Sequence, residues 1–240
     1  MIVACPATYH EAVVSEALAR GCHVMVEKPL ALTGSGAIEL ASRADASSRI
    51  LQVGHQERFV LEAMGLFDIP ETPNALTAVR AGPPAPDGRA GDVSVIWDLM
   101  IHDLDMAAKL MGDDADIQSM GRIIHSDHID EATVKLTFPS GTAELTASRA
   151  ADERKRGMTL TYPSGVISID FLTRAIENST PFEIKADVSE TMPDPLGAAD
   201  DAFFEACLGK RDCAIPGREA AIAVAFAERA EHSTFETAGA

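Results

Sequence analysis

Two segments of the sequence combine acidic and basic side chains in a way that suits proton transfer. In the first, Glu27 and Lys28 directly follow the apolar run Val24-Met25-Val26. A lysine next to a carboxylate and partly removed from water could polarise a substrate oxygen or shuttle a proton. The alternative is that two solvated charges precede Pro29, which stops a regular element.

The second segment lies in a helix that the hydrophobic pattern predicts over residues 97–111. On that helix Asp98, His102 and Asp105 occupy positions i, i+4 and i+7, which share one face. A neighbouring carboxylate fixes the tautomer of a histidine and favours its charged form, which suits a base that takes a proton from an alcohol. The alternatives are a solvated polar face and, with less support because no further ligands are apparent, a divalent metal site.

The elements around Glu27-Lys28 alternate between strand and helix. In chain order they are a strand over 2–5, a helix over 11–20, a strand over 24–26, a helix capped by Thr33 or Ser35, and a strand over 50–53. This alternation predicts a parallel sheet with right-handed crossovers. Open sheets of this kind bind ligands beyond the carboxyl ends of their strands, where Glu27-Lys28 stands.

The rest of the chain predicts a second, α+β domain. After the helix over 97–111 come strands over 117–124, 130–138, 141–149, 157–162 and 165–171, and then helices over 198–208 and 217–234. Pro139-Ser140-Gly141 and Pro163-Ser164-Gly165 predict tight turns, and hence hairpins. The expected fold class is α/β plus α+β. We expect residues 1–58 to form part of a doubly wound parallel-sheet domain, and residues 59–240 to form a domain with a large, mainly antiparallel open sheet.

Four blocks in this order resemble the glucose–fructose oxidoreductase / inositol dehydrogenase (Gfo/Idh/MocA) family. They are Val-Ala-Cys-Pro-Ala-Thr-Tyr-His (3–10), Gly-Cys-His-Val-Met-Val-Glu-Lys-Pro-Leu-Ala (21–31), Gly-His-Gln-Glu-Arg-Phe (54–59) and Trp-Asp-Leu-Met-Ile-His-Asp-Leu-Asp (97–105). The resemblance implies an oxidoreductase that uses NAD or NADP. Such an enzyme moves a hydride between the cofactor and a secondary alcohol of a sugar, an inositol or a nucleotide sugar. The third block leans towards nucleotide sugars.

The resemblance also implies roles for single residues. His102 would take the hydroxyl proton, Asp98 would orient and charge the site, and Lys28 would hydrogen-bond the reacting oxygen and the cofactor. The implied cofactor-binding residues are Pro6, His10, Glu27, Lys28 and Gln56, and the implied substrate-binding residues are Arg58, Asp98 and His102. From the residues alone, Arg58 could equally pair with an acidic neighbour, and His10 is a polar residue early in a helix.

One element of the family pattern does not occur in these 240 residues, namely Gly-x-Gly-x-x-Gly. That loop holds the cofactor's pyrophosphate on backbone N–H groups and a helix N-terminus. By comparison with the family we expect a shortened version of the nucleotide domain, through a late start site or a deletion. An alternative function follows from this expectation. The chain would then be a catalytically inactive homologue that acts as a structural, oligomerising subunit or as a sugar-binding module.

Composition and charge restrict the class of partner. The formal net charge of −17 argues against nucleic acid or an anionic membrane surface, since both select clustered Lys and Arg. No apolar run approaches the roughly 20 residues that span a bilayer. We expect a cytoplasmic protein with a small sugar-type substrate that forms a homo-oligomer through the open sheet. The four cysteines lack C-x-x-C spacing and are expected to be reduced and buried.

Two further groups of polar residues have ordinary explanations. His125 and His128 stand at a predicted strand junction, where exposure to water is a simpler expectation than metal binding. Arg149, Arg154, Lys155 and Arg156 could attract an anionic substrate, although a solvated strand end and loop accounts for them as well.

Overall fold

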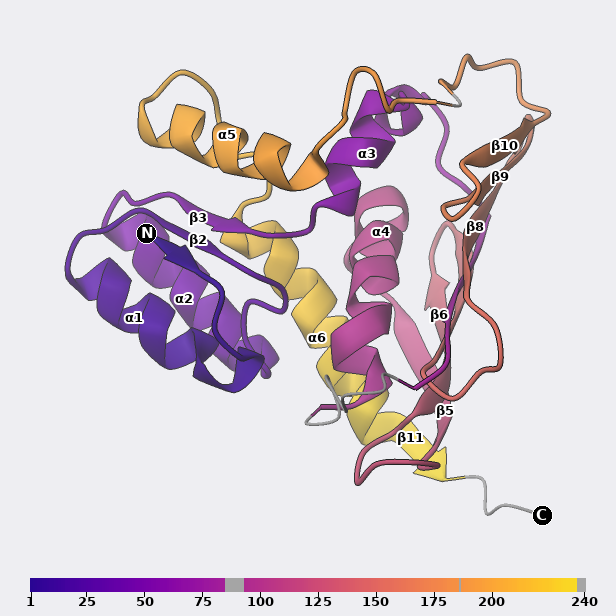
Figure 1. Ribbon diagram of the computed structural model, residues 1–240, viewed down its shortest axis with the longest axis horizontal. Helices are drawn as coiled ribbons and strands as arrows, with labels where there is room; N and C mark the ends of the chain where they lie inside the picture. The colour runs from indigo at the N-terminus through magenta and orange to yellow at the C-terminus, as the bar shows by residue number, and fades with distance from the viewer. Residues whose placement is uncertain (85–92, 186, 237–240) are drawn as a thin grey trace. The chain divides into compact units, whose positions relative to one another are not determined.

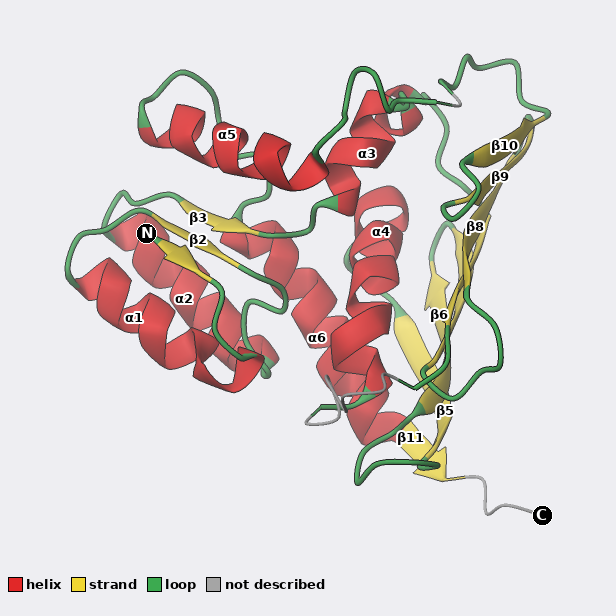
Figure 2. Ribbon diagram, viewed as in Figure 1, coloured by secondary structure: helices red, strands yellow, loops and turns green. Residues whose placement is uncertain are grey.

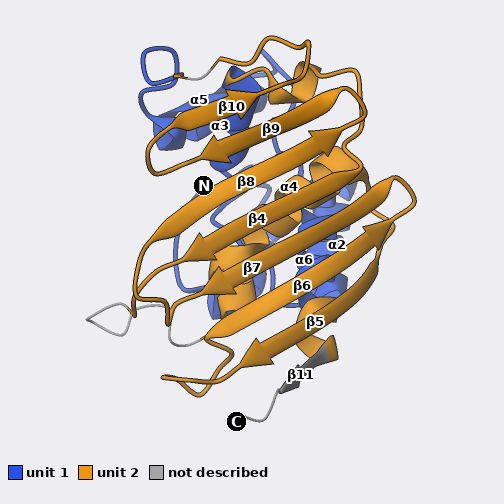
Figure 3. Cartoon of the chain, turned by 90° about the vertical axis from the view of Figure 1, so that its right-hand side faces the viewer, with its two compact units in different colours: residues 1–63, 188–228 blue, residues 64–187, 229–240 orange. Residues whose placement is uncertain are grey.

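The chain folds into two units that do not follow a single boundary along the sequence. The computed structural model describes residues 1–84, 93–185 and 187–236 (Figure 1). Unit 1 holds residues 1–63 and 188–228, and unit 2 holds residues 64–187 and 229–240 (Figure 3). The sequence-based prediction instead placed one boundary after residue 58.

Unit 1 includes the late segment because buried polar contacts join it to the first part of the chain. The side-chain Nε2 of Gln52, which is fully buried, donates to the carbonyl oxygen of Ala199 at 2.8 Å. Arg58 Nη1 lies 2.6 Å from Glu219 Oε2. Polar groups removed from water need partners of this kind, so the two segments depend on each other.

A parallel three-stranded sheet in the order β1-β2-β3 forms the centre of unit 1 (Figure 2). The elements of this unit are β1 (Ile2–Val3), η1 (Ala7–Tyr9), α1 (His10–Ala19), β2 (Val24–Val26), α2 (Gly34–Ala46), β3 (Leu51–Val53), α3 (Glu57–Ala63), α5 (Pro195–Cys207) and α6 (Gly217–Ser233), whose last residues from 229 on count with unit 2. The predicted partial doubly wound pattern is confirmed. All residues of β2 and β3 are buried, as expected for interior parallel strands.

Local signals in the sequence explain where the first two helices end and begin. Helix α1 stops at Arg20-Gly21, where Gly21 adopts a φ of +75° and the N–H of Cys22 donates to the carbonyl of Ala17 at 3.0 Å. Helix α2 begins after Thr33, whose hydroxyl oxygen accepts from the N–H of Gly36 at 3.1 Å. Of the two predicted caps, Thr33 is therefore the one used.

Unit 2 is built on an eight-stranded sheet in the order β10-β9-β8-β4-β7-β6-β5-β11. Its elements are η2 (Leu66–Asp68), β4 (Ala75–Ala81), η3 (Ile96–Met100), α4 (Ile101–Met111), β5 (Asp116–Arg122), β6 (Glu131–Phe138), β7 (Gly141–Ser148), β8 (Lys155–Tyr162), β9 (Gly165–Asp170), β10 (Ala175–Asn178) and β11 (Thr234–Glu236). The predicted large and mainly antiparallel sheet is confirmed, with parallel pairing at β4–β7 and β5–β11. Both predicted hairpins, β6–β7 and β8–β9, are present.

One face of the unit 2 sheet packs against helix α4 and is apolar. Along β4 the buried residues alternate with less buried ones, and β6, β7 and β8 show the same period of two. Leu76, Val134, Leu145 and Leu160 are among the side chains that are fully removed from water on this face. Figure 3 shows the opposite face, which none of the described elements of unit 2 crosses and which is rich in threonine.

Two further predictions concern membrane-spanning helices and the state of the cysteines. In the described ranges, no helix combines the length and the apolar character needed to cross a bilayer. The four cysteines are free thiols, as predicted, although each is only half-buried. Burial raises the pKa of the Cys213 thiol to about 11, so it is protonated near neutral pH.

The loop between β5 and β6 closes on the buried carboxylate of Asp130. One oxygen, Oδ2, accepts the backbone N–H groups of residues 124, 125 and 126 at 2.7, 2.6 and 3.0 Å. The other, Oδ1, accepts from Arg149 Nε at 2.6 Å and from the Ser126 hydroxyl at 2.8 Å. Burial alone would raise the pKa of Asp130, but these hydrogen bonds hold that pKa well below its usual range.

We expect Asp130→Asn to lower the free energy of unfolding by about 3–5 kcal/mol, because it leaves the Arg149 charge without its buried partner. A carboxyl group whose pKa is lower in the folded state stabilises the fold, and this stabilisation is complete above the unfolded-state pKa of about 4. The stabilisation is lost as the pH falls from there through the folded-state pKa. The difference between wild type and variant should therefore be constant above about pH 4 and shrink below it.

Denaturant unfolding at several pH values measures this difference. Asp127→Asn is the matched control, because Asp127 is exposed in the same loop and its substitution should change stability by less than about 0.5 kcal/mol. Equal stabilities of wild type and Asp130→Asn near neutral pH would contradict the interpretation.

Candidate active site

The residues predicted to contact the cofactor gather at one edge of the unit 1 sheet. The three strands are parallel, so their carboxyl ends share an edge, and the strand ladder continues past them into the loops. The N–H of Glu27 donates to the carbonyl of Val3 at 2.9 Å, and the N–H of Gly54 donates to the carbonyl of Val26 at 2.8 Å. Ligands of open α/β sheets bind at this edge.

Glu27 and Lys28 are half-buried at the end of β2. The backbone of Gly54 approaches the Glu27 side chain so closely that a Cβ at that position would lie 3.1 Å from both carboxylate oxygens. A side chain at position 54 would therefore require the carboxylate to shift by a few tenths of an ångström. Pro6 and Gln56 stand in the loops that follow β1 and β3, so they belong to the same edge of the sheet.

His10 lies within this edge and is almost completely buried. Its Nδ1 is 2.6 Å from the carbonyl oxygen of Pro29, and its Nε2 is 2.8 Å from the carbonyl oxygen of Cys5. The ring therefore links the loop after β1 to the loop after β2, which carries Lys28.

In unit 2, Asp98 and His102 stand on consecutive turns of different geometry. Residues 96–100 form a π-helical turn, η3, and the regular helix α4 begins at Ile101. The sequence predicted one regular helix over 97–111. A π turn has hydrogen bonds from i to i+5, so the predicted i, i+4, i+7 alignment does not continue across it. Asp98 and His102 are half-buried, whereas Asp105 is fully buried.

A buried ion pair next to these residues was not predicted. Arg80 Nε on β4 lies 2.7 Å from Asp103 Oδ2 on α4, and the two side chains are only 3% and 2% exposed. The signal was present in the sequence, because Arg80 occupies an inward position in the alternating pattern of β4. A charge there requires a partner of opposite sign.

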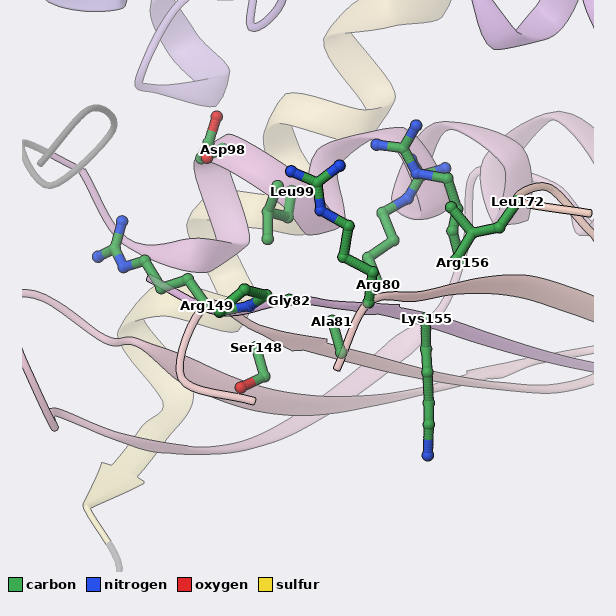
Figure 4. Close-up of a pocket in the computed structure, with 12 residues that line it drawn as sticks. Arg80, Ala81, Gly82, Asp98, Leu99, Ser148, Arg149, Lys155, Arg156 and Leu172 are labelled. Carbon is green, nitrogen blue, oxygen red and sulfur yellow. The ribbon is translucent and has the colours of Figure 1, made fainter. Parts of the chain in front are cut away.

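A cavity of about 370 Å³ opens within unit 2 beside this ion pair (Figure 4). Its lining residues come from the end of β4, from η3, and from the segments around the end of β7, the start of β8 and the end of β9. They are Arg80, Ala81, Gly82, Pro83, Asp98, Leu99, Ser148, Arg149, Arg154, Lys155, Arg156 and Leu172. Asp98 is thus the predicted catalytic residue that the structure places in a pocket of unit 2.

Other predicted residues have structural partners. The guanidinium of Arg58 is buried and paired with Glu219, which was the alternative to substrate binding. His125 is exposed in the loop that closes on Asp130. Within the described ranges, no three or more His, Cys, Asp or Glu side chains are grouped closely enough to hold a metal ion.

The chain thus combines a small parallel sheet that has polar loops at its carboxyl edge with a separate, large and mainly antiparallel sheet. Residues 1–55 match the model of the Gfo/Idh/MocA oxidoreductase family with an NAD-binding Rossmann fold. The predicted resemblance to the Gfo/Idh/MocA family is therefore confirmed over these residues.

The comparisons with individual proteins agree with this family. A UDP-N-acetylglucosamine 3-dehydrogenase of Acidithiobacillus ferrooxidans is 33% identical over 214 residues, which are 86% of this chain and 64% of that relative. This chain thus spans 64% of the length of that relative. A crystal form of the Acidithiobacillus enzyme superposes with a TM-score of 0.85 at 29% identity, covering 97% of this chain and 77% of that one.

A second solved structure shares the fold at low sequence identity. The WlbA dehydrogenase of Bordetella pertussis, in complex with NADH and UDP-GlcNAcA, has a TM-score of 0.84 at 14% identity. The superposition covers 97% of this chain and 76% of that one. At this identity the similarity is one of fold alone.

We expect His10→Ala to lower the free energy of unfolding by about 2–4 kcal/mol, because two buried carbonyl groups lose their hydrogen-bond partner. Denaturant unfolding followed by far-UV circular dichroism measures this change. His125→Ala replaces an exposed histidine and should alter stability by less than about 0.5 kcal/mol. If the two variants were equally stable, the His10 bridge would have no structural importance.

Proposed function

We propose that the chain acts in an NAD- or NADP-dependent dehydrogenase that moves a hydride between the nicotinamide ring and a secondary alcohol of a sugar, with nucleotide sugars as the favoured class. The observation that carries the proposal is the carboxyl edge of the unit 1 sheet, where the Glu27 carboxylate lies against Gly54 and Lys28 follows directly in the chain. The similarity to a UDP-N-acetylglucosamine 3-dehydrogenase supports the choice of substrate class.

The residues at this edge fit the nicotinamide half of the cofactor. The Glu27 carboxylate lies against the bare backbone of Gly54 and offers acceptors for ribose hydroxyl groups. Pro6 and Gln56 flank the same edge, while His10 holds the two loops together. When bound, the cofactor supplies or accepts the hydride. The Gly-x-Gly-x-x-Gly pattern is not among these 240 residues, so the proposal assigns them no contact with the pyrophosphate.

Three side chains have proposed roles towards the substrate. The His102 imidazole takes the proton of the reacting hydroxyl, and the Asp98 carboxylate orients the substrate and adds negative charge to the site. The Lys28 ammonium donates a hydrogen bond to the reacting oxygen and stabilises negative charge that develops there. Orientation and electrostatics are thus the contribution of the protein, as is usual for cofactor-dependent hydride transfer.

A second candidate function follows from the exposed face of the unit 2 sheet. Thr77, Thr146 and Thr159 project from that face, and a shallow hollow of about 370 Å³ lies among them. We propose that two copies of the chain pair through this face, either within an active enzyme or as a structural subunit without catalysis. We also assign the chain to the cytoplasm, which the four free thiols support.

We expect Lys28→Ala to lower turnover about 10²–10⁴-fold, because the reacting oxygen loses its charged donor. The assay follows nicotinamide absorbance with UDP-N-acetylglucosamine as the first substrate tested. Lys210→Ala removes an exposed lysine of the same unit and should leave turnover unchanged. Near-equal turnover of Lys28→Ala and wild type would remove Lys28 from the mechanism.

Titration of the intact chain with NADH and NADPH separates the two candidate functions. Saturable binding at micromolar concentration supports the dehydrogenase and shows which cofactor is preferred. The absence of binding up to millimolar concentration, in a protein that sediments as a dimer, would support the structural subunit instead.

A further inference from the structure

Asp98 stands near the start of its helical segment, where a helix is held least by its own hydrogen bonds. The first N–H groups of a helix have no partner within it and bond to groups before or outside it. Here the N–H groups of Trp97 and Asp98 both donate to the carbonyl oxygen of Ser94, each at 3.1 Å. Ser94 is buried, and its hydroxyl donates to Glu231. The backbone position of Asp98 therefore depends on how residues 93–95 are held.

Both neighbours of Ser94 are bound to one polar network. Arg149 Nη2 donates to the carbonyl oxygen of Val93 at 2.9 Å. The N–H of Val95 donates to the carbonyl oxygen of Ile129 at 2.8 Å, and Arg149 Nη2 lies 3.3 Å from the same oxygen. A guanidinium group thus holds the chain directly before Ser94, and the loop between β5 and β6 holds it directly after.

The Arg149 guanidinium is itself fixed by the carboxylate of Asp130. Arg149 Nε lies 2.6 Å from Asp130 Oδ1, and the two side chains are 14% and 1% exposed. Ile129 directly precedes Asp130, so the loop that closes on this carboxylate also provides the carbonyl group that receives Val95. A guanidinium suits these contacts because its planar fork presents several donors in fixed directions. Arg149 extends away from Arg80 in Figure 4, so the two arginines support different parts of the cavity wall.

Helix α4 has a support of its own, the ion pair between Arg80 and Asp103 at 2.7 Å. His102 stands beside Asp103 in this regular helix, whereas Asp98 belongs to the π-helical turn η3 that precedes it. The hydrogen-bonding pattern changes between the two parts, and each part has a separate set of side-chain contacts to the sheet and its loops. Loss of the contacts to residues 93–95 should therefore displace Asp98 more than His102.

We propose that Arg149 is a positioning residue that acts on the substrate through Asp98. By holding residues 93–95 it sets where the Asp98 carboxylate lies in the wall of the unit 2 cavity, which both residues line. The inference rests on the proposed dehydrogenase function, in which Asp98 orients the substrate. A direct contact between Arg149 and the substrate is the competing explanation, and a double-mutant cycle separates the two.

The cycle combines substitutions of Arg149 and Asp98 in the full chain, with UDP-N-acetylglucosamine as the first substrate. Arg149→Gln should lower kcat/KM about tenfold, the loss that corresponds to hydrogen bonds from a charged group. In the background of Asp98→Ala, the same substitution should change kcat/KM by less than about twofold, because the residue through which it acts is gone. A direct contact with the substrate would give the same loss in both backgrounds.

Arg149→Lys separates positioning from plain stabilisation. A lysine keeps a charge for Asp130, but its ammonium lacks the fork that also reaches the Val93 carbonyl. It should restore most of the thermal stability lost in Arg149→Gln, while kcat/KM stays at least about fivefold below wild type. The matched control is Ile167→Ala, which removes a fully buried side chain of β9 and destabilises the fold without touching residues 93–95. Its kcat/KM, measured where the variant is folded, should lie within about twofold of wild type.

Amide hydrogen exchange tests the geometry without requiring turnover. In Arg149→Gln the N–H groups of Val95 and Asp98 should exchange at least about tenfold faster than in wild type, because the segment that holds them is less firmly bound. The N–H groups in the last turns of α4 should keep their rates, since the contacts of that helix are unchanged.

Three results would overturn the positioning role of Arg149. They are an equal loss of kcat/KM with and without the Asp98 side chain, a kcat/KM that follows thermal stability in every variant including Ile167→Ala, and unchanged exchange at Val95 and Asp98. A wild type without turnover on any sugar or nucleotide sugar would count against the dehydrogenase function. The exchange rates would then decide alone whether Arg149 holds Asp98 in place.

Discussion

The ion pair between Arg80 and Asp103 is the constraint on which the cavity of unit 2 depends. Two charges removed from water are tolerated only when they face each other with good geometry, and removal of either would leave the other uncompensated. The pair therefore fixes helix α4 over strand β4 at one position along the strand. Because Asp98 and His102 belong to the same continuous helical segment, their placement over the sheet follows from that fixed position.

In unit 1 a buried polar side chain has a comparable structural role. There a single buried imidazole, that of His10, joins two loops through backbone carbonyl groups. Beyond the ladder bonds at Glu27 and Gly54 these loops leave the sheet, and side-chain links of this kind then hold them in a defined shape. In both units a buried polar side chain, and not the regular elements themselves, sets the geometry of the chemically interesting residues.

The regular parts of this fold were predictable, whereas its long-range pairings were not. Short apolar strands between helices predicted the parallel sheet of unit 1, and the Pro-Ser-Gly turns predicted the β6–β7 and β8–β9 hairpins. These features depend on local sequence. The insertion of β4 between β7 and β8 depends on partners far along the chain, and no local pattern indicates it. The strands β10 and β11 were missed because edge strands of three or four residues carry little periodicity.

The candidate site likewise combines residues that were predictable from the sequence with a cavity that was not. Lys28, Asp98 and His102 were found from sequence because their residue types and neighbours are distinctive. The cavity was not, since it combines segments around β4, η3, β7 and β8 that only the tertiary fold assembles. The basic residues at 149–156 looked like one cluster in the sequence. The strand geometry and the ion pair with Asp130 separate them into a structural arginine, an outward lysine and two arginines at the cavity.

The central position of β4 has a consequence for how the chain reaches this structure. Ala75 pairs with Thr142 on one side and with Thr161 on the other, so both partners of the middle strand lie far along the chain. Closing such long loops costs entropy before any contact repays it, and folding rates fall as the mean separation of contacts rises. Until then β4 is an apolar strand with two open edges, which makes the early folding phase the period of greatest exposure to aggregation.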